Sequence, residues 1–418
     1  MEQKMVEPCA KKPHLTGALA RLTEDTVTDI LLRLPAKSVL RCGAVCRALH
    51  GITTDPGFHA AHARLQPAGV VLYTYLYLAP PPSVTIQLWE DHTIDTALDV
   101  VPVSSSESGR RRLVRYPKMP DWLLLASSDS VLLFKKTQEF FVLFNPTTRQ
   151  WAELPRLPHH QEERFNRSDR EFAFYLDVPS GEFRLLCRRN FTGSATKWCI
   201  LSTGSAAEPR DVDMRAAEAA GITELVPCLR TSKGPHVPLH GRLHWPPHQQ
   251  AAVTGQTEMV VFDMSSEMFH LMAGPPTTTG MLTKLFDMDG LLVTADFGKV
   301  KHVDLWFLED YDTKRWELRH RVASPWGSGD GIPVDPSQLL SVAAAGDREG
   351  NIMLGNTKGL VVYNVRTKTV KAVDSVATSD NDDDDVLLSR HVFKESLVQH
   401  PGFVAAAQSS IDLSLVHF

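Results

Sequence analysis

A pattern that occurs five times between residues 140 and 370 is the feature of the sequence that restricts the fold most. In each copy an apolar run ends at Asn or Asp, a polar turn follows, and an aromatic or β-branched residue comes six positions later. The five pairs are Asn145 and Trp151, Asp177 and Phe183, Asp263 and Phe269, Asp310 and Trp316, and Asn364 and Val370. Because Asn and Asp close turns by accepting hydrogen bonds from nearby backbone amides, each copy predicts a β-hairpin. The side chain at the sixth position is then expected to pack between sheets.

The spacing of these hairpins predicts a ring of four-stranded sheets. Four hairpins are preceded by a further strand-like run, and three of these runs begin at a Gly; they span residues 131–134, 241–245, 290–295 and 350–354. The later hairpins follow one another at intervals of roughly 50 residues, close to the length of one propeller blade. The β-like texture extends from residue 70 to residue 418, which is enough for about six to eight blades. An array of β-sandwiches is the alternative.

Residues 22–65 have a helical texture instead. Thr23 can cap a helix through its hydroxyl, and Pro35 stops that helix. The apolar residues between these signals follow the spacing of one helical face: Val27, Ile30, Leu31 and Leu34. The sequence therefore predicts a helix of about three turns.

Further short helices are expected after Pro35. Ser38 can begin one, and Gly43 divides the following apolar positions between two helices. The segment from Phe58 to Leu65 predicts a last one. A unit of this size with apolar residues on more than one face needs a further surface to cover it, from the same chain or from another protein.

Three pieces of this segment resemble an F-box of the kind found in plant F-box proteins. They are residues 30–38 (ILLRLPAKS), residues 41–47 (RCGAVCR) and the pair Asp55-Pro56. The resemblance implies a three-helix module that docks on a Skp-type adaptor and so joins the cullin and RING subunits of a ubiquitin ligase. The adaptor contacts that it implies are Leu22, Ile30, Leu31, Leu34, Pro35, Leu40, Val45, Cys46 and Leu49. Of these, Ile30, Leu31 and Leu40 are expected to belong to the core of the module as well.

Two positions depart from the F-box pattern. Thr23 stands where the family usually has Pro, and Leu49 stands where it usually has Trp. Buried aromatic side chains often anchor interfaces. These departures leave open an alternative function, a propeller scaffold that does not assemble productively with a ligase.

Residues 140–155, FFVLFNPTTRQWAELP, are similar to a signature of the domain that follows the F-box in many plant family members. That domain is propeller-like and binds substrates. The expected fold class is α+β and multidomain, with a flexible lead at residues 1–21, an F-box-like module at residues 22–66 and a β-propeller at residues 70–418. The expected function is substrate recognition for an SCF-type ligase, with an unknown protein as the target.

Composition restricts the partners and the compartment. The net charge of -5 gives no basic footprint for nucleic acid or an anionic membrane. The sequence has no secretory signal and no apolar run long enough for a membrane span. Its six cysteines include no CxxC pair, which suits a reducing compartment. We therefore expect an intracellular protein of the cytoplasm or the nucleus.

No motif predicts catalysis, a metal or a cofactor. His236, His240, His244 and His248 are evenly spaced, but Pro238 and Pro246 forbid the helix that would align them. His59 and His62 are expected to be exposed histidines of a helix. The enzyme alternative, a propeller hydrolase or oxidoreductase, would not need the helical module.

Two charged segments are expected to be solvated. Residues 104–112 predict a loop that ends in the basic cluster Arg110-Arg111-Arg112, with a docking or nuclear import patch as the alternative. The acidic run at residues 381–385 predicts an exposed loop tip.

Overall fold

The computed structural model divides the chain into two units. It describes residues 22–77, 94–104, 109–117, 123–128, 130–135, 141–154, 172–190, 196–203, 209–215, 236–247, 257–277, 282–299, 301–323, 343–356, 359–373, 385–397, 400 and 402–405. One unit comprises Met1–Gln66 together with Glu395–Gln399, and the other comprises Pro67–Lys394 together with His400–Phe418. We call them the helical unit and the propeller. The lead predicted at residues 1–21 lies outside the described residues.

The helical unit contains α1 (Glu24–Leu32), α2 (Ala36–Gly43), α3 (Arg47–Thr53) and α4 (Pro56–Leu65). Thr23 caps α1, because its hydroxyl accepts a hydrogen bond from the Thr26 amide at 3.3 Å. Asp55 caps α4 through a 2.8 Å bond from the Phe58 amide. Both caps satisfy backbone amides that have no partner inside the helix.

Some helix boundaries differ from the prediction. The break between Gly43 and Arg47 confirms the predicted division into two helices, and four helices are present where the resemblance implies three. α2 begins at Ala36 rather than Ser38, and α4 begins at Pro56 rather than Phe58. Proline suits the first position of a helix, because the amide that it lacks would have no intrahelical partner there.

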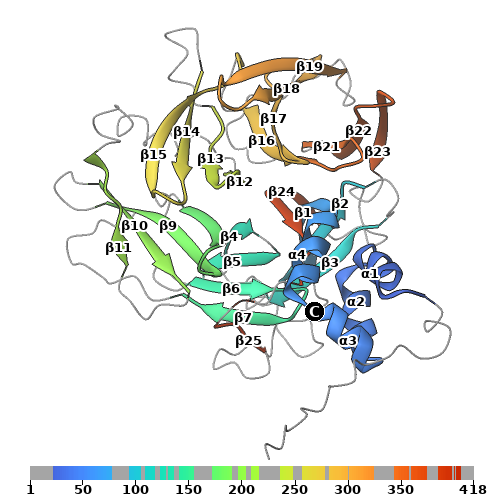
Figure 1. Ribbon diagram of the computed structural model, residues 1–418. Helices are drawn as coiled ribbons and strands as arrows, with labels where there is room; N and C mark the ends of the chain where they lie inside the picture. Colours follow the sequence, from blue (N-terminus) through green and yellow to red (C-terminus); the bar gives the residue numbers. More distant parts are fainter. Residues whose placement is uncertain are drawn as a thin grey trace, which may run out of the picture. The chain divides into compact units, whose positions relative to one another are not determined.

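The propeller consists of six antiparallel sheets arranged around a common centre (Figure 1). Blade 1 comprises β24 (Asp385–Lys394), β1 (Ala68–Tyr77), β2 (Ile94–Pro102) and β3 (Arg111–Pro117). Blade 2 comprises β4 (Leu123–Ser128), β5 (Val131–Lys135), β6 (Phe141–Asn145), β7 (Gln150–Glu153) and β25 (Val404–Ala405). Blade 3 comprises β8 (Phe172–Asp177), β9 (Glu182–Asn190), β10 (Thr196–Ser202) and β11 (Arg210–Asp211).

The remaining blades follow in chain order. Blade 4 comprises β12 (Val237–Leu239), β13 (Arg242–His244), β14 (Glu258–Asp263) and β15 (Met268–Ala273). Blade 5 comprises β16 (Thr283–Met288), β17 (Leu291–Asp296), β18 (His302–Asp310) and β19 (Arg315–Ala323). Blade 6 comprises β20 (Ala343–Gly346), β21 (Asn351–Asn356), β22 (Gly359–Asn364) and β23 (Thr369–Val373). The prediction of six to eight blades is confirmed at its lower end.

Two late segments of the chain add strands to the first two blades, and one of them closes the ring. β24 pairs with β1, with Ala68 opposite Lys394 and Gly69 opposite Phe393, so the end of the chain completes blade 1. β25 adds to the outer edge of β7, where Val404 is opposite Trp151. Among the described residues an apolar cluster lies between each pair of neighbouring blades, including blades 6 and 1. Because strands are covered on both faces, several are apolar throughout; all five residues of β6 are buried.

All five predicted hairpins are present, and each is closed by its Asn or Asp. The Asn145 Oδ1 accepts hydrogen bonds from the amides of Thr147 (2.9 Å) and Thr148 (3.2 Å). Asp263 and Asn364 make the same pair of bonds to the second and third residues after them. The last residue of each turn has a positive φ: Arg149, Gly181, Glu267, Lys314 and Lys368.

The prediction for the sixth position holds only in part. Trp151, Phe183 and Phe269 are buried, and Trp316 is half-buried. Val370 is exposed, so the prediction was wrong there. It lies on β23, the outermost strand of blade 6, and residues 369–372 of this strand are all exposed.

The prediction of a solvated loop at the basic cluster was wrong in part: Arg111 and Arg112 are exposed but belong to β3, and residues 105–108 lie outside the described residues. Arg110 donates a hydrogen bond from Nε to Asp99 Oδ2 (2.7 Å), and Arg112 donates from Nε to Oδ1 (3.0 Å). Asp99 is buried in β2, so the two arginines attach β3 to β2. Of the acidic run, residues 381–384 lie outside the described residues, and Asp385 begins β24.

The hairpin closures predict a stability effect at Asp310. Its Oδ1 accepts hydrogen bonds from the amides of Asp312 (2.9 Å) and Thr313 (3.1 Å). Asp310→Ala removes both and is expected to lower the Tm by roughly 2–4 °C in a scanning calorimeter. Asp310→Asn should leave the Tm unchanged, since Asn makes these bonds at two other hairpins. Equal losses for the two variants would contradict the role of the side-chain oxygen.

The buried histidines of the propeller predict a stability that depends on pH. Burial lowers the pKa of His236, His244 and His400 to about 4, below the ordinary value of 6.5. The unfolded chain therefore binds protons first as the pH falls, so their contribution is complete above pH 6.5 and is lost towards pH 4. Each is expected to reduce the free energy of unfolding by about 1.4 kcal/mol per pH unit inside this window.

Calorimetry between pH 7 and pH 5 measures this effect. The Tm should fall steadily over this range, and His244→Gln should reduce the proton uptake on unfolding by about one proton. A Tm that does not change between pH 7 and pH 5 would contradict the assignment of neutral buried histidines.

Candidate functional site

Most of the predicted adaptor contacts lie on the surface of the helical unit. The exposed fractions are 39% for Leu22, 46% for Ile30, 46% for Leu40 and 73% for Val45, and Pro35 is exposed as well. Leu34 and Cys46 are half-buried. Leu31 and Leu49 are buried and belong to the core of the unit, where they offer no surface to a partner. We call the other seven residues the apolar set.

The concentration of apolar side chains on this short segment is unusual for a surface. In the described part of the chain nine large apolar side chains are exposed, and five of them lie between residues 22 and 65: Leu22, Ile30, Leu40, Val45 and Leu65. Single exposed apolar residues need no explanation, but a group of them marks an interaction surface.

The charged residues between Ile30 and Thr54 have one sign, whereas the exposed Glu24, Asp25 and Asp29 come before them in the chain. Between residues 30 and 54 the chain has Arg33, Lys37, Arg41 and Arg47, all exposed, and no Asp or Glu. A partner that fits this segment would combine an apolar groove with acidic residues at its rim, because complementary charge steers association.

Buried polar groups fix the turn between α1 and α2. The Leu34 carbonyl accepts hydrogen bonds from His62 Nε2 (2.8 Å) and Gln66 Nε2 (3.3 Å), both at the end of α4. The Ala36 amide donates to Glu395 Oε2 at 3.1 Å. Leu34 and Pro35 are therefore held through the backbone on both sides, which leaves the Pro35 side chain free to point outward.

His59 and His62 are buried, so the prediction that they are exposed was wrong. His59 Nε2 donates to the Thr53 carbonyl at 2.7 Å. Burial lowers the pKa of His62, although its bond to the Leu34 carbonyl and the nearby Glu395 carboxylate act in the opposite direction. Both rings are thus structural donors that hold α4 to the preceding elements.

The core of the helical unit includes one residue from the far end of the chain. The cluster comprises Val27, Leu31, Ala36, Val39, Leu49, Phe58 and Leu397. Leu397 is 2% exposed, and its neighbour Ser396 is buried as well. Sequence reasoning missed Glu395 and Leu397, since nothing in a segment more than 300 positions away marks it as part of this core.

The connections between strands of the propeller leave the blades at one of two opposite ends, because strand direction alternates within each blade. Turns from the first to the second strand of a blade, and from the third to the fourth, leave at one end, because neighbouring strands are antiparallel. Nine of these eleven connections contain two or four residues. We call this end the turn face. β24 ends and β1 begins there, at the paired residues Lys394 and Ala68.

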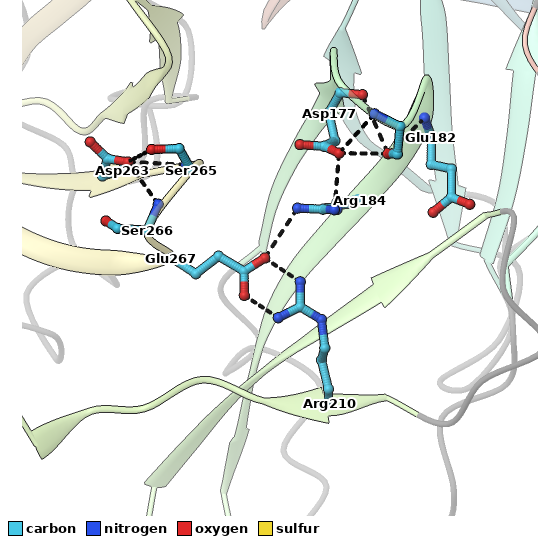
Figure 2. A network of polar contacts seen from close by, with 9 residues as sticks. Asp177, Glu182, Arg184, Arg210, Asp263, Ser265, Ser266 and Glu267 are labelled. Atoms are coloured by element: carbon cyan, nitrogen blue, oxygen red, sulfur yellow. Dashed lines mark hydrogen bonds and ion pairs between the residues drawn. The ribbon is translucent and has the colours of Figure 1, made fainter.

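Ion pairs across neighbouring blades connect the turns of this face. Figure 2 shows Arg184 between Asp177, to which it donates at 2.9 Å, and Glu267, to which it donates at 3.1 Å. Arg210 donates two bonds to the same Glu267 carboxylate. Arg348 of blade 6 pairs with Asp289 of blade 5 at 2.9 Å. The charges are matched pair by pair, so these contacts hold the blades together and do not form a reactive centre.

The opposite end, the loop face, carries the connections between second and third strands and between successive blades. Several are long: residues 78–93, 154–171, 212–236 and 324–342 join consecutive strands. Asp304, near this end of β18, is buried and accepts from Lys299 Nζ (2.5 Å) and Arg321 Nε (2.8 Å). Burial would raise the pKa of Asp304, but these two hydrogen bonds outweigh it and keep the pKa below its usual value.

The described histidines of the evenly spaced group have structural contacts. His236 Nε2 donates to the Phe174 carbonyl at 2.9 Å, and His244 contacts the Val237 carbonyl and the Tyr311 hydroxyl. His248 lies outside the described residues. Within the described ranges no three His, Cys, Asp or Glu side chains form a group that could hold a metal ion. None of the four described helices has the length and apolarity needed to cross a bilayer.

Comparison with known proteins agrees with both units. Residues 112–393 match the family described as the F-box associated beta propeller domain, and residues 19–60 match the F-box domain. F-box protein At3g07870 of Arabidopsis thaliana is 22% identical over 330 residues, which cover 74% of this chain and 74% of that protein. F-box protein CPR1 of the same plant is 22% identical over 325 residues, which cover 73% of this chain and 74% of that protein.

The burial pattern predicts different effects at Leu31 and Val45. Leu31→Ala leaves a cavity in the core of the helical unit and is expected to destabilise it by about 2–5 kcal/mol. Val45→Ala should change the stability by no more than about 0.5 kcal/mol, since the side chain is exposed. Amide hydrogen exchange of α1–α3 in the full chain measures both. The assignment of core and surface fails if Val45→Ala is the more destabilising of the two.

Proposed function

Because the chain belongs to the family with an F-box domain and an F-box-associated β-propeller, we propose that it is the substrate receptor of a cullin-RING (SCF-type) ubiquitin ligase. The helical unit binds a Skp-type adaptor, which connects it to the cullin and RING subunits. The propeller binds a target protein. The observation that carries this proposal is the exposure of Leu22, Ile30, Leu40 and Val45 in a small unit whose core is formed by other apolar residues.

The adaptor contact follows from the chemistry of the apolar set. Burying a side chain such as Val45 or Leu40 stabilises a complex by about 1.5–3 kcal/mol. The turn at Leu34 and Pro35 is held by His62 and Glu395, so little conformational freedom is lost when a partner binds it. The exposed Arg33, Lys37 and Arg41 add attraction to an acidic rim and make the association sensitive to salt.

The loop face is the proposed surface for the target. Binding residues are concentrated on loops that a rigid scaffold positions, and the long connections of the propeller leave from this end. The turn face has short turns that ion pairs join to one another, so it offers less variation in shape. The selectivity of the receptor would therefore depend on the connections between blades.

The mechanism that we propose is proximity without covalent chemistry by this chain. The receptor holds a lysine of the target near an activated ubiquitin that other subunits carry. The transfer then becomes effectively intramolecular, and the gain comes from the raised effective concentration. The chain needs no nucleophile, metal or cofactor for this role.

We also propose an intracellular location, in the cytoplasm or the nucleus. The six cysteines of the sequence include no CxxC pair. Scattered cysteines of this kind suit a reducing compartment.

The alternative of a scaffold without ligase assembly rests on Thr23 and Leu49. Leu49 lies in the core, and Thr23 supplies the cap of α1. Neither departure removes a side chain from the apolar set. The adaptor experiment below separates the two functions.

Binding of the full chain to a purified Skp-type adaptor tests the proposal. Val45→Asp places a charge in the proposed contact and is expected to reduce the affinity by at least tenfold, since about 1.4 kcal/mol is lost per factor of ten. The matched control is Val178→Asp in a turn of the propeller, where the valine is 79% exposed. The control should bind like the parent chain.

Two results would count against the receptor role. Failure of the parent chain to bind any Skp-type adaptor would favour the scaffold. Binding that Val45→Asp and Val178→Asp leave equally unchanged would place the adaptor contact elsewhere.

A further inference from the structure

The segment that follows β24 joins the helical unit, although it is synthesised more than 300 residues later. The Glu395 carboxylate accepts from the Ala36 amide at 3.1 Å, at the first position of α2. Two residues later the side chain of Leu397 is 2% exposed and lies in the cluster with Val39 and Leu49. We call residues 395–397 the strap.

The strap supplies what residues 22–66 lack. α2 begins after Pro35, which has no side-chain oxygen to cap a helix, and Glu395 takes this role from outside. A carboxylate at the start of a helix is also favoured by the helix dipole. Leu397 covers the apolar faces of α1–α3, so the additional surface that this small unit needs comes from its own chain.

The place of the strap is determined by ring closure. Lys394 is the last residue of β24 and lies opposite Ala68, the first residue of β1. Glu395 follows directly. α4 ends at Leu65 and β1 begins at Ala68. The pairing of β24 with β1 therefore brings the strap, which is distant in sequence, to the point where the chain leaves the helices.

We infer that the strap positions the adaptor-binding surface, so that this surface is complete only in a chain whose propeller has closed. The inference rests on the proposed function, because it concerns the same surface. Glu395 accepts a hydrogen bond from the amide that follows Pro35, and Leu397 packs in the cluster that contains Val39, the residue before the exposed Leu40. Glu395 and Leu397 are thus positioning residues that do not themselves contact the adaptor.

The position of the strap in the sequence implies that the propeller folds before the helical unit can bind the adaptor. The residues of the apolar set leave the ribosome before the strap, which is made more than 300 residues later. A chain without the strap has an uncapped α2 and an uncovered core, and helices this short are unstable on their own. Recruitment of the ligase therefore waits until the target-binding domain is complete.

Substitutions in the full chain test this inference. Leu397→Ala is expected to reduce the affinity for a Skp-type adaptor at least tenfold and to raise the exchange rates of amides in α1–α3 at least tenfold. Leu397→Met keeps the side-chain volume, so the adaptor affinity and the exchange rates of α1–α3 should stay close to those of the parent chain. Glu395→Ala should lower the affinity about three- to tenfold, because it removes one charged hydrogen bond. The matched control is Leu387→Ala, also on the β24 segment, where the leucine is 52% exposed.

The two readouts separate this inference from the proposed function. If the parent chain binds no adaptor, the receptor role fails, and hydrogen exchange still measures the strap. Exchange in α1–α3 that is the same in Leu397→Ala and Leu387→Ala would overturn the inference. Equal loss of protection in β14 and β22 would also overturn it, since the effect would not be local to the helical unit.

Discussion

The antiparallel pairing of β24 with β1 is the interaction on which the rest of the structure depends. It completes blade 1 with a strand from the far end of the chain and so closes the ring of six sheets. Closure buries the apolar cluster between blades 6 and 1 and protects inner strand edges that an open array would expose. The same pairing places Glu395 and Leu397 one and three residues beyond β24, where they cap α2 and fill the core of the helical unit.

The local elements could be predicted because their causes are local. The five hairpins follow from an Asn or Asp whose side chain bonds amides two and three positions on, and α1 follows from Thr23 and its apolar stripe. The errors have distant causes. Leu397 and Glu395 reach the helices across the length of the chain, Asp99 recruits Arg110 and Arg112 from another strand, and His62 is buried by the turn at Leu34. Val370 is exposed on β23, the outermost strand of its blade.

The sequence pattern could not show which of the nine predicted adaptor contacts lie in the core of the helical unit and which lie on its surface. Leu31 and Leu49 have the same apolar character as Ile30 and Val45, and only the packing of the helices decides which side chains are covered. The charged groups of the propeller likewise have to be divided by their contacts, into those that stabilise blades and those that could mark a site. Glu267, Asp304 and Asp99 are each matched by arginine or lysine, so their charges stabilise blades and do not mark a reactive site.

Amide hydrogen exchange of the full chain, with and without a saturating Skp-type adaptor, tests the central claim most directly. The account predicts that the adaptor slows exchange between residues 30 and 47, around Pro35, Leu40 and Val45, and leaves the strands of blades 3 to 5 unchanged. Unchanged exchange throughout residues 22–66, or protection that appears only in the propeller, would contradict it.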